Sequence, residues 1–411
     1  MDLNKLFNPS SIAIVGASEE EGKVGNVVTK NILSLGFRGD VFLVNPKHEN
    51  LFARKCYKSL SEIQEPVDLA VIIIPAKLVA SEIEKNAAKI KNYVIISAGF
   101  SEVGDEGRER EEKIKEIAEK NQLNILGPNC LGFINPYKKL NATFAGDMPE
   151  EGNIALVSQS GALAVGILDI AQKENLKFSK VISIGNKADI DEAEIMEYLE
   201  NDSNTRVIAM YLEGIKNGQR FLEKAADISR NKPIIILKAG KTEKAQKAIS
   251  SHTGALAGSD DIASVIFEKA GITRADSTEE FFGLLQLFSF SQELKNEYIA
   301  VITNAGGPGV IATDAFKDKH IKIMEISEKT KEKLRKVLPS ESSVENPVDV
   351  LGDAREDRYK NVMTILNKEE KPGAYLIILT PQDQTPVSKV ASKIIQFKKK
   401  TDSIIAVSFI G

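Results

Sequence analysis

A single histidine on a segment of small and polar residues is the first candidate for chemistry. His252 lies in SSHTGALAGSD (250–260) and is one of only three histidines in 411 residues. A largely neutral imidazole can act as a nucleophile or a metal ligand. The segment lacks the large apolar neighbours of a core histidine. It also lacks the HExxH, CxxC or carboxylate cluster of a zinc site, so no metal site is predicted. An exposed loop histidine without a ligand is the alternative.

The chain around His252 has the composition of a loop. Residues 238–260, KAGKTEKAQKAISSHTGALAGSD, follow the apolar run IIIL and are rich in glycine, serine and threonine. These residue types favour loops over element interiors. We therefore expect a mobile loop, whose small flanking residues let the imidazole reach more than one site.

Two turns of small residues have the sequence of anion sites. Residues 158–162, SQSGA, lie between an apolar run and a predicted helix, where free N–H groups and the helix dipole favour an anion. An ordinary capped helix is the alternative. Residues 304–309, NAGGPG, have a similar context, which suggests an internal duplication. They contain no lysine, so they are no Walker loop.

A glycine turn near the N-terminus predicts a site for a larger phosphate-bearing ligand. Residues 12–25, IAIVGASEEEGKVG, run from a strand through Gly16 into a helix, but they do not match GxGxxG. The next strand ends in Asn45-Pro46-Lys47, where an NAD site would have an acidic residue. Lys47 suits a ribose phosphate, as in coenzyme A or NADP. A structural turn without a ligand is the alternative.

These turns require parallel sheets, because the carboxyl ends of parallel strands meet at one ligand-binding edge. Short β-branched runs alternate with amphipathic segments such as 105–121, which predicts α/β domains with helices on both sheet faces. The expected strands are 11–16, 40–45, 69–75, 93–99 and 123–129, then 153–158, 180–185, 206–214, 233–240 and 271–275, then 298–303, 321–325, 375–380 and 403–411. We expect three domains, at 1–146, 152–294 and 297–411. The third is expected to be incomplete at its C-terminal end, because the chain stops directly after a strand.

Composition excludes several classes of protein. The net charge of −4 gives no electrostatic basis for nucleic-acid binding, and the apolar runs are too short for a membrane span. No signal peptide is visible at the N-terminus. Two cysteines make no disulfide framework, so we expect a cytoplasmic protein.

The motifs together resemble a known family. The set VGAS…GKVG, NPK, IIIPA, SAGFSE and GPNCLG is similar to the CoA-binding domain of the NDP-forming acyl-CoA synthetases, which include succinyl-CoA synthetase. The resemblance implies a Rossmann-like CoA-binding domain followed by two flavodoxin-like domains. The residues that it places around CoA are Gly16, Ser18, Lys23, Asn45, Lys47, Pro75, Ser97, Gly99, Asn129 and Cys130.

The same resemblance implies roles for the histidine and its surroundings. In this family the residue that matches His252 carries a phosphoryl group. Glu213, after a strand in MYLEGI, would accept a hydrogen bond from the other ring nitrogen; a solvated carboxylate is the alternative. Asn186 and Lys187 resemble a further active-site turn without a defined role. The residues that would bind the phosphate are Ser158, Ser160, Gly161 and Ala162.

Nearly the whole chain resembles the α subunit of an ADP-forming acetate–CoA ligase. The implied reaction converts acyl-CoA, ADP and phosphate into a carboxylic acid, CoA and ATP. No ATP-grasp site is visible, so the resemblance implies an ATP-grasp β subunit that binds Mg-ADP or Mg-ATP in an α2β2 heterotetramer. The alternatives are a CoA-sensing or scaffold protein on the same domains, and an NADP-dependent oxidoreductase, against which the broken fingerprint and the His252 segment argue.

Overall fold

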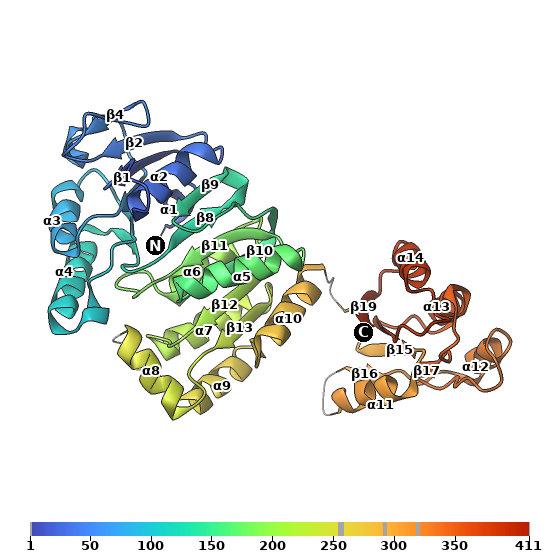
Figure 1. Cartoon of the computed structure of the whole chain (residues 1–411). Helices are drawn as coiled ribbons and strands as arrows, with labels where there is room; N and C mark the ends of the chain where they lie inside the picture. The colour runs from blue at the N-terminus through green and yellow to red at the C-terminus, as the bar shows by residue number, and fades with distance from the viewer. Residues whose placement is uncertain (1, 254–258, 291–293, 318–320, 411) are drawn as a thin grey trace. The chain divides into compact units, whose positions relative to one another are not determined.

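The fold was analysed in a computed structural model that describes residues 2–253, 259–290, 294–317 and 321–410, with only the backbone for 251–253. The chain divides into two compact units, Met1–Ser289 and Phe290–Gly411. In Figure 1, unit 1 runs from blue to the orange helix α10 (Thr278–Phe290), and unit 2 continues from orange to red. The α/β fold predicted from the sequence is confirmed.

Unit 1 begins with a seven-stranded sheet of order β3-β4-β2-β1-β5-β6-β7. Apart from the antiparallel β3–β4 pair, its strands are parallel. The strands are β1 (Ser11–Val15), β2 (Asp40–Val44), β3 (Asn50–Leu51), β4 (Arg54–Tyr57), β5 (Leu69–Ile72), β6 (Asn92–Ile95) and β7 (Asn124–Leu126). The helices are α1 (Asn4–Phe7), α2 (Val24–Ser34), α3 (Ala76–Asn86) and α4 (Asp105–Asn121), with short 3₁₀ turns η1 (Leu60–Glu62) and η2 (Ser101–Val103).

The second sheet of unit 1 has the order β14-β13-β12-β10-β11-β8-β9, parallel except for β8 and β9. Its strands are β8 (Gly132–Asn135), β9 (Leu140–Thr143), β10 (Glu151–Ser158), β11 (Phe178–Ser183), β12 (Val207–Leu212), β13 (Ile234–Lys238) and β14 (Thr273–Ala275), with the turn η3 (Pro136–Lys138). Besides α10, its helices are α5 (Gly161–Lys173), α6 (Glu192–Glu200), α7 (Gly218–Ile228), α8 (Glu243–Thr253) and α9 (Asp260–Lys269).

The two sheets share one hydrophobic core. Ile12 and Ile14 of β1 belong to the same buried cluster as Val157 of β10 and Ile182 of β11. The β8–β9 hairpin was not predicted, although it extends the second sheet by two strands and packs against helix α2. The shared core explains why both sheets form a single compact unit.

A backbone junction joins the carboxyl edges of the two sheets. The turn after β7 accepts two hydrogen bonds from the turn after β11: Asn186 N–H donates to Pro128 O at 2.9 Å, and Ala188 N–H to Gly127 O at 3.0 Å. Gly185 has φ +56°, and a Cβ there would lie 2.2 Å from Pro128 O. Only glycine therefore allows this approach without displacement.

Unit 2 contains a smaller parallel sheet of order β16-β15-β18-β19, with β17 also paired to β15. Its strands are β15 (Tyr298–Thr303), β16 (Lys322–Ile323), β17 (Val348–Asp349), β18 (Ala374–Leu379) and β19 (Ile404–Phe409). Its helices are α11 (Gly306–Ala315), α12 (Glu328–Arg335), α13 (Glu356–Glu369) and α14 (Val387–Lys398). A separate hydrophobic cluster, including Tyr359 and Tyr375, forms its core.

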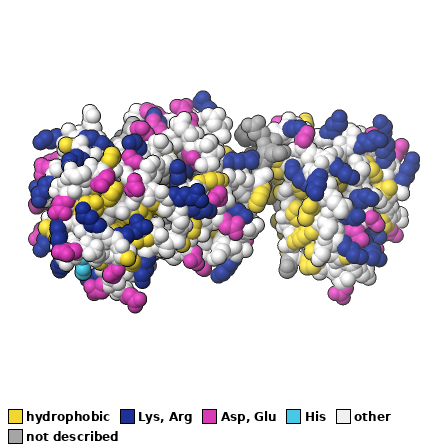
Figure 2. Space-filling view, turned by 90° about the horizontal axis from the view of Figure 1, so that it is seen from above, with side chains coloured by type: hydrophobic (Ala, Val, Ile, Leu, Met, Phe, Trp, Pro, Cys, Tyr) yellow, Lys and Arg dark blue, Asp and Glu magenta, His cyan; other side chains and the backbone are white. Residues whose placement is uncertain are grey.

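The surface carries both signs of charge. Figure 2 shows lysines and arginines interspersed with aspartates and glutamates on the face that it presents. In the described part of the chain, none of the helices has both the length and the apolar character of a membrane span.

The junction gives a test of the fold. Gly185→Ala should lower the free energy of unfolding by about 1–3 kcal/mol, because the new methyl group displaces backbone and the left-handed conformation disfavours a side chain. Gly166→Ala is the matched control: a Cβ at Gly166 meets nothing within 4 Å, and the site lies inside helix α5. The control should raise stability by about 0.5–1 kcal/mol. Urea unfolding measures both, and an unchanged midpoint for Gly185→Ala would contradict this view of the junction.

Candidate active site

The glycine turn after β1 packs tightly against its neighbours. Gly16 has φ +98°, and a Cβ there would lie 2.3 Å from Ile73 O. The Ser18 hydroxyl accepts a hydrogen bond from Glu20 N–H at 3.0 Å. Lys23 stands at the N-cap of helix α2 and forms an ion pair with the Glu20 carboxylate. The backbone can therefore approach a ligand at the start of α2, beside a lysine.

The end of β2 is tied to the same turn. The Asn45 side chain donates to Ala17 O at 2.8 Å and accepts from Lys47 N–H at 3.0 Å. Lys47 itself is exposed. Asn45 thus shapes the turn, and the Lys47 ammonium group can reach an anion in solvent.

The next two strand-end loops are held by their own polar groups. The Ser97 hydroxyl donates to Ile74 O at 2.6 Å, next to Pro75, which precedes helix α3. Gly99, at φ +108°, donates its N–H to the Glu102 carboxylate at 2.6 Å. Burial opposes ionisation of Glu102, but hydrogen bonds from Gly99, Asn186 and other donors outweigh it and lower its pKa.

Asn129 and Cys130 of GPNCLG have different environments. Asn129 adopts φ +54°, donates its N–H to Ser97 O at 3.0 Å and is exposed. Cys130 is buried, and its thiol donates to Ile95 O at 3.3 Å. Burial raises the pKa of Cys130 to about 12. The thiol is therefore protonated near neutral pH and unsuited to nucleophilic attack.

The predicted phosphate turn leads into helix α5. The Ser158 hydroxyl is buried and donates to Ser160 O at 2.7 Å, while the Ser160 hydroxyl caps the helix by accepting from Leu163 N–H at 3.3 Å. The N–H groups of Gly161 and Ala162 come before Leu163 in the first turn and have no acceptor within the helix. They are the groups that an anion at the helix end would bind.

Glu213 and the His252 segment follow the ends of β12 and β13. Glu213 is 7% exposed. Burial and the Glu213 carboxylate raise the pKa of Tyr211 to about 12. His252 lies in the last turn of helix α8, so the prediction of a loop is wrong for residues 243–253. The His252 side chain and residues 254–258 lie outside the described part.

A cavity of about 560 Å³ brings many of the predicted residues together. It is lined by seven of them: Ser97, Asn129, Cys130, Ser160, Gly161, Ala162 and Glu213. The apolar part of the lining was not predicted from the sequence. It is formed by Val24, Ile73, Ile74, Ile96, Leu131, Phe144 and Val165. The remaining residues predicted to surround CoA lie in loops at the carboxyl ends of β1, β2, β5 and β6. They are Gly16, Ser18, Lys23, Asn45, Lys47, Pro75 and Gly99.

A second cavity, of about 450 Å³, shares lining residues with this one and is also lined by Lys187 and Lys216. Gln159 and Asn186 line both cavities. The Asn186 amide donates to the Glu102 and Glu111 carboxylates, both at 2.8 Å, and accepts from Asn129 at 3.2 Å. Asn186, for which the sequence indicated no role, thus links turns that follow both sheets.

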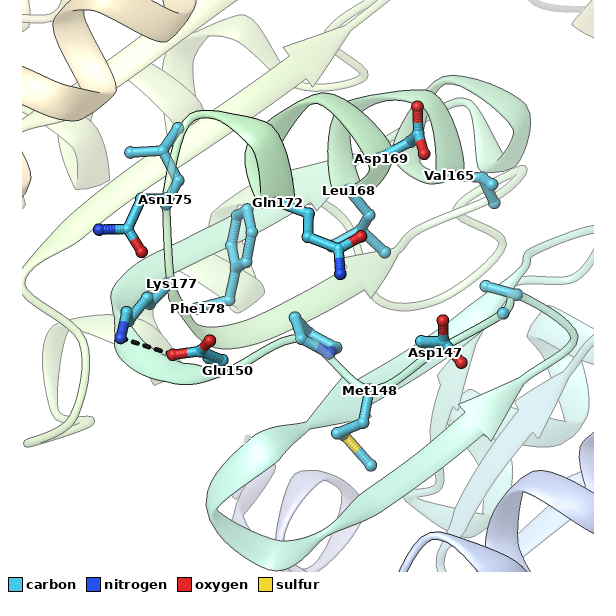
Figure 3. Close-up of a pocket in the computed structure, with 14 residues that line it drawn as sticks. Asp147, Met148, Glu150, Val165, Leu168, Asp169, Gln172, Asn175, Lys177 and Phe178 are labelled. Carbon is cyan, nitrogen blue, oxygen red and sulfur yellow. Dashed lines mark ion pairs between the residues drawn. The ribbon is translucent and has the colours of Figure 1, made fainter.

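A third cavity, of about 270 Å³, lies between helix α5 and residues 145–150 (Figure 3). It contains none of the predicted site residues, although Val165 borders both it and the active-site cavity. Its labelled polar residues include Asp147, Asp169 and the ion pair of Lys177 with Glu150 at 2.5 Å (Figure 3).

The turn 304–309 of unit 2 repeats part of the phosphate turn. The Thr303 hydroxyl donates to Ala305 O at 2.8 Å, as Ser158 does to Ser160. Asn304 accepts from Thr380 N–H at 2.8 Å, at the end of the neighbouring strand. However, the Asp349 carboxylate lies 3.7 Å from the Cβ position of Gly306. This negative charge makes the start of α11 a poor anion site.

Protein-family models match three parts of the chain. A CoA binding domain covers residues 10–136, a succinyl-CoA ligase-like flavodoxin domain covers 151–288, and a ligase-CoA domain covers 299–389.

Several relatives match most of the chain. Acetate–CoA ligase [ADP-forming] I of Archaeoglobus fulgidus is 42% identical over 96% of the chain, which spans 57% of that relative's length. Acetate–CoA ligase [ADP-forming] II subunit alpha of Pyrococcus furiosus is 44% identical over 89% of the chain and 79% of its own length. A solved structure of the dinucleotide-forming acetyl-coenzyme A synthetase 1 of Ca. Korarchaeum cryptofilum, in complex with phosphate and ADP, matches with a TM-score of 0.94 and 36% identity, covering 100% of this chain and 89% of that one. The chain therefore belongs to the family of ADP-forming acetate–CoA ligases.

Proposed function

We propose that the chain is the part of an ADP-forming acyl-CoA ligase that binds CoA and phosphate and carries the phosphoryl group. The overall reaction is acyl-CoA + ADP + phosphate ⇌ carboxylic acid + CoA + ATP. The observation that supports the proposal is the shared cavity, which is lined by Gly161 and Ala162 at the start of helix α5 and by Glu213, Ser97 and Asn129.

The first step uses the α5 end of the cavity. Phosphate bound at Gly161 and Ala162 attacks the carbonyl carbon of the thioester, and the carbon–sulfur bond breaks. CoA leaves as the thiolate and takes up a proton, and an acyl phosphate remains. Cys130 takes no part, because its thiol is protonated and buried.

The second step uses His252. A ring nitrogen attacks the phosphorus atom, and the bond between phosphorus and the acyl oxygen breaks, which releases the carboxylate. Glu213 accepts a hydrogen bond from the other ring nitrogen and stabilises the positive ring that develops. A β-phosphate oxygen of ADP then attacks the same phosphorus, which regenerates the imidazole and forms ATP.

The transfer of the phosphoryl group to ADP requires a nucleotide site, which the cavity residues and His252 do not provide. We propose that an ATP-grasp β subunit binds Mg-ADP and forms an α2β2 heterotetramer with this chain. The subunit alpha relatives and the length of the longer relatives support a partner or additional region. The free cysteines Cys56 and Cys130 fit a reducing cytoplasm.

The phosphohistidine step can be tested on the chain alone. With acetyl-CoA and ³²P-phosphate, the chain should acquire an acid-labile, base-stable label without nucleotide. His252→Ala should abolish the label, His320→Ala should label like the wild type, and Glu213→Gln should label about 10- to 100-fold more slowly. Rapid quench and gel counting give these rates. Equal labelling of His252→Ala would refute the phosphohistidine.

The CoA site has its own test. CoA should raise the melting temperature, by an amount corresponding to about 2.7 kcal/mol at a hundredfold excess over its dissociation constant, and NADP should not. Lys47→Glu should weaken CoA binding by about tenfold, because it places a carboxylate next to the ribose phosphate. Lys89→Glu, an exposed lysine beyond the end of helix α3, is the matched control. A thermal shift with NADP alone would indicate a dinucleotide enzyme instead.

A further inference from the structure

The dipeptide Glu213–Gly214 is held by side chains from other strand ends. The Gln159 amide oxygen accepts from Glu213 N–H at 2.9 Å and from Gly214 N–H at 3.1 Å. The Lys238 ammonium group donates to Glu213 O at 2.9 Å, and the Lys187 ammonium group donates to Gly214 O at 2.8 Å. Both N–H groups and both carbonyl groups of the dipeptide are thus bound by side chains.

The two lysines are buried, so an ammonium group that lost its partners here would cost more free energy than one at the surface. Lys187 and Lys238 are 5% and 3% exposed. Lys187 also pairs with the buried Glu192 carboxylate at 3.1 Å, and Lys238 also donates to Ala239 O. Burial lowers the pKa of Lys238, and the carboxylates of Asp260 and Glu213 oppose this. A buried ammonium group is costly unless its donors are satisfied, so each lysine is held by the partners named here.

Gln159 and Lys238 stand at strand ends that lead to the predicted phosphate turn and to the His252 helix, respectively. Gln159 lies in the turn between β10 and α5, and its backbone N–H donates to Tyr211 O at 3.0 Å. Lys238 is the last residue of β13, ahead of helix α8 with His252. Lys187 follows β11 and adopts φ +59°, a conformation that is uncommon for a residue with a side chain. A shift of any of these strand ends would move the Glu213 backbone.

We propose that Gln159, Lys187 and Lys238 are positioning residues, which hold Glu213 at the place where it orients the His252 imidazole. The inference rests on the proposed function, since it needs Glu213 to act in phosphoryl transfer. A displacement of about 1 Å at a reacting centre can cost about a hundredfold in rate. The position of the Glu213 backbone is therefore expected to determine the rate of histidine phosphorylation, although none of the three contacts involves the Glu213 carboxylate.

The chain offers a matched control for a lysine that binds backbone carbonyls. Lys232 donates to Leu199 O and to Asp202 O, both at 2.8 Å, and burial lowers its pKa. It precedes β13, at the strand end opposite to Lys238. Lys232→Met should lower the melting temperature while leaving the phosphorylation rate within about twofold of the wild type.

The experiment is a double-mutant cycle on the single-turnover rate of ³²P-labelling from acetyl-CoA and phosphate. In the wild-type background, Lys238→Met and Gln159→Leu should each slow labelling by about 10- to 100-fold. In the Glu213→Gln background, each should slow it by less than about twofold, because the group being positioned is already lost. CoA affinity, measured separately, should stay within about twofold for Lys238→Met, because Lys238 is not among the residues that line the cavity.

The outcomes separate the inference from the proposed function. If Glu213→Gln labels slowly, and Lys238→Met and Gln159→Leu slow labelling by the same factor in that background as in the wild type, the positioning role alone is overturned. Wild-type labelling by Glu213→Gln would overturn both that role and the action of Glu213. If Lys238→Met does not fold, Gln159→Leu, which replaces a half-buried side chain, decides the question.

Discussion

The backbone junction between the turns 127–130 and 184–190 is the contact on which the rest of the site depends. Through Gly127, Pro128, Asn186 and Ala188 it hydrogen-bonds the carboxyl edge of one parallel sheet to that of the next. The Leu131 N–H adds a bond to the Ser183 hydroxyl at 3.0 Å. Since ligands bind at the carboxyl edges of parallel sheets, joining two such edges makes one candidate site with residues from both sheets.

The start of helix α5 lines that cavity, and two buried lysines donate to the Glu213–Gly214 backbone next to it. Helix α5 directs its first N–H groups toward the cavity, and Lys187 and Lys238 place positive charge beneath Glu213. Unit 2 has a similar strand, turn and helix, but Asp349 lies beside the start of its helix. The comparison shows why a glycine-rich turn is insufficient by itself: the surrounding charges decide whether a helix end attracts an anion.

The repeated α/β pattern was sufficient to predict the fold class and most strands. The helix 105–121 was predicted with the bounds of α4, because its charged residues surround a clear apolar stripe. The hairpins β3–β4 and β8–β9 were missed, since short polar strands have no distinct periodicity. Residues 243–253 were mistaken for a loop, because their serines and threonines drew attention from the alanines, lysines and glutamine that favour a helix.

The site was predicted only in part, for a physical reason. Motif residues such as Asn129 and Gly161 could be recognised from the local sequence, because each belongs to a short turn with its own signature. The contacts of Gln159, Asn186 and Lys238 depend on strand order. For Gln159 and Asn186, the partner lies more than 50 positions away in the sequence. No local pattern contains that information.

The central claim is that phosphate, and not water, cleaves the thioester and then donates its phosphorus to the protein. The most direct measurement uses ¹⁸O-labelled phosphate and unlabelled acetyl-CoA in a single turnover, followed by mass spectrometry of the released acetate. One ¹⁸O atom in each acetate is the predicted result, because the attacking phosphate oxygen stays on the acyl carbon when the phosphorus is transferred. Acetate without ¹⁸O would contradict the account.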